Sequence, residues 1–263
     1  MLMKLLKYDL KYMLKNMSPF YILGIIFAIL TRIFFSIDGS LICEIIGQIC
    51  VGTMFSMLVS ILINTMMRSW VRFRDFLYKD ESYLTHTLPV TKKDLYNSQF
   101  LQSLIFFVVG FAVIVLSLFI AYYTDARWDM LKSLISSITT GFNFSITFFV
   151  VGMLSIIFLE IFNAIQCGFL GIVIGHKQNN SKVFLSICFG FISYLIAQFI
   201  VLAMVFIVAL FDEGLMNMFT SNVLNNVASF KLLIILSIVL YVTIIFVMSI
   251  VCKKLLNKGV DVE

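Results

Sequence analysis

Glu160 is the one charged residue in a long apolar stretch, residues 141–174. Asn163 and Gln166 follow it at i+3 and i+6, which places the three polar side chains roughly on one side of a helix. A charge near the centre of a membrane-crossing helix costs about 2.5–3.5 kcal/mol and marks a functional candidate. The spacing predicts that these residues line a passage for an amphipathic or cationic substrate. The alternative is that Glu160 bonds a neighbouring helix and only holds the bundle together.

The other residue types that commonly bind metals form no ligand pattern. His86 and His176 lie far apart, and neither belongs to an H-E-x-x-H motif. The five cysteines show no C-x-x-C pair, and they lie within apolar runs: Cys43, Cys50, Cys167, Cys188 and Cys252. Cysteines in such positions are typically small residues packed in a core. We therefore predict no metal site on this chain.

Motifs for catalysis are also missing from the sequence. Enzymes that work inside membranes generally need paired aspartates, a Ser–His or Ser–Lys set, or a zinc motif, whereas Glu160 is isolated. No G-x-x-x-x-G-K-[ST] phosphate loop occurs, because the stretch from Gly171 to Lys177 has the wrong spacing. We predict that the chain is not an enzyme, cannot hydrolyse ATP alone and carries no cofactor.

The elements that position these residues are apolar runs. Of the 263 residues, 61% are hydrophobic and 13% are charged, against about 25% charged in an ordinary soluble domain. About 20 consecutive apolar residues cross a bilayer as a helix, and six runs qualify: roughly 19–37, 41–67, 101–123, 141–174, 183–210 and 232–252. The sequence predicts an all-α integral membrane protein, a bundle of six transmembrane helices forming a single domain over residues 1–263.

The basic residues predict the orientation of this bundle. If both termini are cytoplasmic, the inner segments hold all but four of the 19 lysines and arginines, the exceptions being Arg32, Arg127, Lys132 and Lys231. An excess of basic residues marks the cytoplasmic side. We therefore predict a multi-pass protein with both termini in the cytoplasm and no nucleic-acid partner.

Residues 1–18 place four lysines on one helical stripe, with Leu, Met and Tyr filling most other positions: Lys4, Lys7, Lys11 and Lys15. A helix of this kind lies in the membrane surface, with its ammonium groups near anionic lipid headgroups. Pro19 suits a helix start or a corner before the first span. The alternative is a solvated basic tail.

The segment 68–100 connects the second and third spans and changes character within itself. The second span continues as helix into the cytoplasm, because Arg68, Arg72 and Lys79 follow without a breaker. Pro89 favours extended or turn geometry for residues 86–88. In "TKKD", Thr91 and Asp94 form a capping box that starts a helix running into the third span. We predict a short, ordered reversal whose apolar residues pack on the bundle or dock on a partner.

Small residues recur near the end of the fourth run, at Ala164, Gly168, Gly171 and Gly175. Two small-xxx-small pairs result from this spacing. They favour close packing of this helix against a neighbour.

The stretch "FRDFLYKDESYLTHTLPVTKKDLYNSQFL", together with the basic amphipathic N-terminus, resembles the permease subunits of bacterial ABC exporters of the second exporter class. Several such permeases from Gram-positive bacteria carry a similar phrase at this place. Its matching residues here are Asp80, Glu81, Tyr83, Leu84, Thr85, Thr87, Leu88, Pro89, Val90 and Thr91. The fourth span also ends in a similar way, with "GIVIGHK" before a short basic loop.

The resemblance implies a permease that moves an amphipathic substrate, such as a peptide, drug or lipid-like molecule, across the bacterial cytoplasmic membrane. Residues 1–18 would be an elbow helix on the inner membrane surface, in contact with lipids. The segment between spans 2 and 3 would hold a coupling helix that docks on a separate ATPase through Tyr83, Leu84, Thr85, His86, Thr87, Leu88, Pro89, Val90 and Thr91. Two ATPase subunits, which bind ATP and Mg, and a second permease copy or a related permease would complete the complex.

The same features are compatible with two other classes of protein. A membrane-embedded sensor could signal through the same inner segment to a cytoplasmic partner. An intramembrane enzyme with Glu160 as its catalytic group is less well supported, because no partner residue for catalysis is apparent in the sequence.

Overall fold

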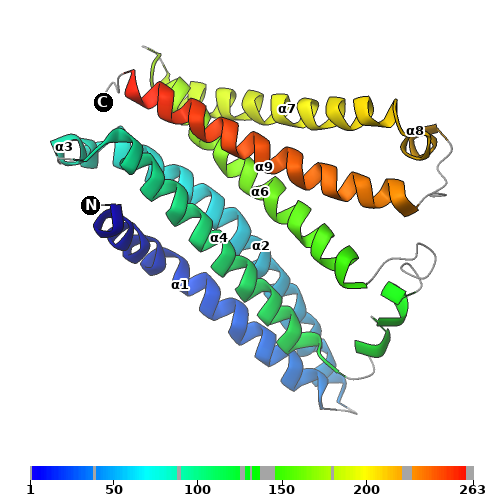
Figure 1. The fold of residues 1–263 in the computed structure, drawn as a ribbon. Helices are drawn as coiled ribbons and strands as arrows, with labels where there is room; N and C mark the ends of the chain where they lie inside the picture. The colour runs from blue at the N-terminus through cyan, green and yellow to red at the C-terminus, as the bar shows by residue number, and fades with distance from the viewer. Residues whose placement is uncertain are drawn as a thin grey trace. The chain divides into compact units, whose positions relative to one another are not determined.

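The computed structural model describes residues 2–37, 40–87, 90–124, 128–130, 132–136, 146–178, 181–220 and 227–258 (Figure 1). Within these ranges all regular secondary structure is helical. The principal helices are α1 (Leu2–Phe35), α2 (Leu41–Leu77), α3 (Asp80–Thr87), α4 (Lys92–Tyr122), α6 (Ile146–Gly175), α7 (Lys182–Ala209), α8 (Glu213–Thr220) and α9 (Val227–Asn257). The predicted all-α fold class is confirmed.

The long helices match the six predicted spans. In length and composition, six of them could cross a membrane: α1, α2, α4, α6, α7 and α9. Their outer faces carry large apolar side chains such as Phe199, which is 68% exposed, and Phe246, which is 66% exposed. Lipid tails cover such faces without cost. The chain therefore has the build of a multi-pass membrane protein.

Helix α1 differs from the predicted boundary at its N-terminal end. Pro19 lies inside one continuous helix, and a separate helix start at this residue is wrong. The two apolar faces of residues 2–18 and 19–35 join, since Met13 and Met17 are buried in line with Tyr21. Packing along this continuous stripe outweighs the local cost of a proline in the helix interior.

Helices α2 and α4 confirm the predicted extension of both spans. Helix α2 continues without a break to Leu77, well past its apolar run. Helix α4 begins at Lys92, where the Thr91 Oγ1 atom accepts a hydrogen bond from the Asp94 N–H at 3.2 Å and donates one to Asp94 Oδ2 at 2.8 Å. The predicted N-cap at Thr91 is confirmed, and the Asp94 side chain reaches back to the Thr91 hydroxyl.

Helix α3 occupies the connection between α2 and α4, and it corrects one local prediction. His86 and Thr87 are helical rather than extended, whereas Leu88 and Pro89 lie outside the described residues. A proline disfavours helix most strongly at the residue directly before it. Helix α3 therefore ends at Thr87, two residues before Pro89.

The helices group into two compact units, one holding α1 to α4 and the other α6 to α9. In the first unit, α1, α2 and α4 pack together along their lengths (Figure 1). Their shared core contains Met13, Met17, Tyr21, Ala28, Met54, Leu58, Ile61, Phe106 and Ala121. Helix α3 lies at the end of this unit where α1 begins (Figure 1).

In the second unit, α6 packs against α7 and α9. The approach of α6 to α7 is so close that a Cβ atom at Gly171 would overlap the backbone of Gly190, and one at Gly175 would overlap the backbone of Ser186. The close packing predicted from the small residues is confirmed at these two positions.

Candidate functional site

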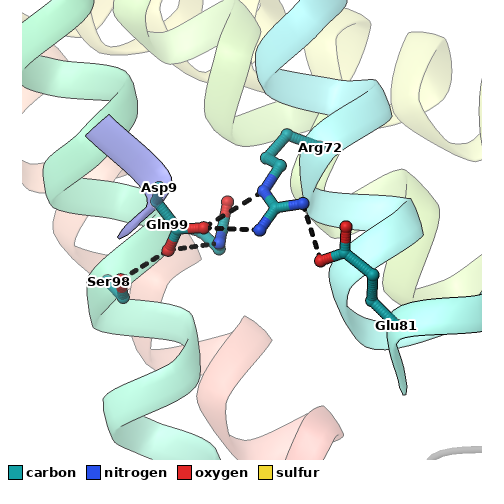
Figure 2. Close-up of polar contacts among 5 residues, drawn as sticks. All are labelled: Asp9, Arg72, Glu81, Ser98 and Gln99. Atoms are coloured by element: carbon teal, nitrogen blue, oxygen red, sulfur yellow. Dashed lines mark hydrogen bonds and ion pairs between the residues drawn. The ribbon is translucent and has the colours of Figure 1, made fainter. Parts of the chain in front are cut away.

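An extensive polar cluster of the described chain lies in the first unit, around Arg72 (Figure 2). Asp9 comes from α1, Arg72 from α2, Glu81 from α3, and Ser98 and Gln99 from α4. Helices α1 to α4 thus all contribute to one network of charged, amide and hydroxyl groups. We call these five residues the Arg72 network.

Asp9 is fully buried, and its carboxylate accepts four hydrogen bonds. Arg72 donates two of them to Oδ1, from Nε at 3.1 Å and from Nη2 at 2.8 Å. Ser98 Oγ and Gln99 Nε2 donate to Oδ2 at 2.8 and 2.9 Å. Because hydrogen bonds to a charged acceptor are the strong ones, these four bonds offset part of the cost of burying the Asp9 carboxylate.

Arg72 is only 1% exposed and has a second carboxylate partner. Its Nη1 atom donates to Glu81 Oε2 at 2.7 Å, and the Glu81 side chain is 42% exposed. Figure 2 shows the guanidinium between Asp9 on one side and Glu81 on the other.

Aromatic rings complete the surroundings of the guanidinium. The ring centroids of Tyr12, Phe76 and Tyr8 lie 4.6, 5.2 and 5.6 Å from its central carbon. An arginine held over aromatic faces is stabilised by the ring quadrupoles, most strongly where water is excluded. The rings and the two carboxylates together define the orientation of this side chain.

The Arg72 network was missed by the sequence analysis, although one signal was present. Leu6, Asp9, Met13 and Met17 share the buried face of α1, opposite the exposed lysines. An aspartate on the apolar face of a helix indicates a buried partner. Its partner Arg72 stands 63 positions further along the chain.

The predicted docking residues lie next to this network. Tyr83, Leu84, Thr85, His86 and Thr87 belong to α3, and the Tyr83 side chain is 63% exposed. Val90 and Thr91 precede α4. Leu88 and Pro89 lie outside the described residues. The Arg72–Glu81 bond thus ties the first turn of α3 to the buried part of the unit.

The N-terminal lysines lie on the exposed face of α1. Lys4, Lys7, Lys11 and Lys15 are all exposed, whereas the opposite face of α1 packs in the unit core. The exposed stripe also carries Tyr8, Tyr12 and Leu14, which are 60, 39 and 55% exposed. This surface combines positive charge with apolar groups, as an interfacial helix does.

The predicted passage residues lie in the second unit, midway along α6. Glu160 Oε1 accepts a hydrogen bond from the Tyr194 hydroxyl of α7 at 3.4 Å. Asn163 and Gln166 are buried, at 0 and 1% exposure, whereas Glu160 is half-buried. One turn along α7 from Tyr194, Gln198 Oε1 accepts a hydrogen bond from the Tyr241 hydroxyl of α9 at 3.3 Å. The structure adds these tyrosines and Gln198 to the surroundings of Glu160.

In the described part of the chain, no group of three or more His, Cys, Asp or Glu side chains is arranged to hold a metal ion. Comparisons with known proteins do not add a family, since no family model, curated protein or solved structure matches the chain.

Proposed function

We propose that the chain is the membrane-spanning permease subunit of a bacterial ABC exporter, driven by ATPase subunits on separate chains. The observation that carries this proposal is a short helix, α3, within the phrase from Asp80 to Thr91, between two spans that both extend beyond their apolar runs. Such a helix suits the coupling helix that the resemblance implies. The exposed lysine stripe of α1 suits contact with anionic lipid headgroups.

The two termini and α3 then face the cytoplasm, where the ATPases bind ATP and Mg. A dimer of permeases, formed with a second copy or a relative, would bring two coupling helices to two ATPases. The substrate is an amphipathic molecule, and Glu160, Asn163 and Gln166 are the candidates to line its path. Hinge and shear motions require packed elements. The Arg72 network holds α3 against the rest of the unit, because it ties Glu81 to the buried Arg72.

The first test is recovery of the partner. The tagged chain is purified gently from its native membranes, and its co-purifying subunits are identified by mass spectrometry. We compare the wild type with Tyr83→Asp, which puts a charge on the exposed face of α3. Leu134→Asp is the control, because Leu134 is 59% exposed and lies on the outer side in the proposed orientation.

An ATPase that is recovered with the wild type and the control, but is lost with Tyr83→Asp, supports the proposed function. Recovery of a partner without a nucleotide-binding site, with the same dependence on Tyr83, favours the sensor instead. If Tyr83→Asp retains as much ATPase as the wild type, α3 is not the docking contact.

A further inference from the structure

Arg72 is bound very differently by its two carboxylate partners. On the Asp9 side, the guanidinium donates two hydrogen bonds to a buried oxygen that lies 2.8 Å from Nη2. On the Glu81 side it donates one hydrogen bond, to a carboxylate with a 42% exposed side chain. Water and salt can therefore reach the second contact, whereas the first is enclosed by protein.

The enclosed contact fixes where the remaining donor of Arg72 points. Two of its nitrogens are held by Asp9, and the Tyr12 and Phe76 rings lie within 4.6 and 5.2 Å of the guanidinium carbon. A planar guanidinium held in this way has its third nitrogen in a fixed direction. Nη1 therefore offers a hydrogen bond at one defined place at the end of the unit.

Helix α3 depends on contacts of this kind. It has eight residues, and isolated helices shorter than about 12–15 residues are marginal in water. Glu81 lies in its first turn, just after the Tyr78 and Lys79 residues that separate α3 from α2. A bond to Glu81 thus acts on the start of α3 with little intervening chain to absorb movement.

We propose that Arg72 is the positioning residue of α3. Asp9 anchors the guanidinium inside the unit, and the exposed bond to Glu81 holds α3 and can open and close while the buried half of the network stays intact. The use of this contact to present a docking surface rests on the proposed function. The positioning itself is a property of the isolated chain and can be measured without any partner.

The test is amide hydrogen exchange of the full chain in nanodiscs of neutral lipid, read by mass spectrometry. The variant is Glu81→Gln, which removes the charge and keeps the shape of the side chain. Asp75→Asn is the matched control, because Asp75 pairs with Arg74 at 2.9 Å on the same helix as Arg72. We expect Glu81→Gln to raise exchange in residues 80–87 about two- to fivefold, with α1, α2 and α4 unchanged and no effect from Asp75→Asn.

Salt separates a positioning ion pair from ordinary packing. Raising the salt from about 0.05 to about 0.5 M shortens the screening length to a few ångströms and weakens the exposed contact more than the buried one. Exchange in α3 is expected to rise with salt in the wild type and to be insensitive to salt in Glu81→Gln. Equal exchange in both proteins, or faster exchange spread over α1, α2 and α4, would overturn the proposal.

Recovery of the ATPase is scored for the same variants, so that the two proposals can fail separately. If hydrogen exchange responds as expected but no ATPase is recovered from any variant, the positioning role stands and the proposed function fails. If exchange in α3 is faster in Glu81→Gln but ATPase recovery equals that of the wild type, docking does not need the positioning of α3 by Arg72. That result would overturn this part of the proposal. Weaker recovery with Glu81→Gln alone supports both proposals.

Discussion

Asp9 and Glu160 are two carboxylates inside helical units, and their surroundings differ. Asp9 is fully buried and accepts two hydrogen bonds from Arg72 and one each from Ser98 and Gln99. Glu160 is half-buried and accepts a long hydrogen bond from Tyr194 at 3.4 Å. Among the described residues, Arg72 pairs with Asp9 and Glu81, and Arg74 pairs with Asp75.

The difference indicates two uses of a charge inside a membrane protein. A carboxylate with a full set of donors has no capacity left for a ligand, and it fixes the helices that supply those donors. A carboxylate that accepts a single hydrogen bond from a neutral donor has acceptor positions left for a ligand. We therefore assign structural work to Asp9, and we retain Glu160 as the candidate for contact with substrate.

The largest expected effect comes from Asp9→Asn. This change leaves the buried Arg72 without its enclosed counter-charge, and breaking a buried pair from one side costs about 3–5 kcal/mol. Thermal and denaturant unfolding of the purified protein in mild detergent measures the loss. Asp75→Asn is the control and should change the free energy of unfolding by less than about 1 kcal/mol, because its pair with Arg74 is partly exposed. An Asp9→Asn protein as stable as the wild type would contradict the structural assignment.

A double substitution separates the effect of the buried charges on stability from the effect of side-chain volume. Asp9→Leu with Arg72→Met removes both buried charges, and such replacements are often neutral or stabilising compared with a broken pair. We expect the double variant to recover at least about 2 kcal/mol relative to the sum of the two single variants. Additive losses in the same unfolding assay would mean that Asp9 and Arg72 act independently.

The cap at the start of α4 gives a smaller effect at the same end of the unit. Thr91→Ala removes the hydroxyl that accepts from the Asp94 N–H, which costs about 1 kcal/mol. Thr91→Ser keeps the hydroxyl and should retain most of the free energy of unfolding. Equal losses for the two variants would show that the methyl group of Thr91, and not the cap, is what matters.

The smallest expected change in stability is that of Glu160→Gln. The amide oxygen can still accept from the Tyr194 hydroxyl, and removal of the charge relieves the cost of holding it midway along α6. We expect the free energy of unfolding to stay within about 1 kcal/mol of the wild type, while transport into sealed vesicles falls. A loss of stability as large as that of Asp9→Asn would make Glu160 structural as well and end the comparison.

Local patterns in the sequence predicted much of the helical layout. The six apolar runs predicted the six long helices, because crossing a membrane requires a long uninterrupted apolar segment. Thr91 and Asp94 predicted the start of α4, since a capping box involves residues only three positions apart. Gly171 and Gly175 predicted a close helix contact for a similar reason.

At Pro19, and at His86 and Thr87, the structure differs from the local preference of the sequence, because packing outweighed that preference. Pro19 favours a helix start in isolation, yet α1 continues through it because its buried stripe gains more from packing than the proline costs. His86 and Thr87 continue α3 although Pro89 follows closely. A sequence pattern cannot weigh these opposing energies, because the packing partners are not yet known.

The sequence by itself determined where the membrane helices run and where the polar connection lies, because these depend on composition over short windows. Only the tertiary structure decided which polar residues act together. Asp9 and Arg72 are 63 positions apart, and Asp9 and Gln99 are 90 apart, so no spacing rule could have joined them. They meet because the buried faces of α1, α2 and α4 pack together, and a charge enclosed by that packing must find its partner inside it.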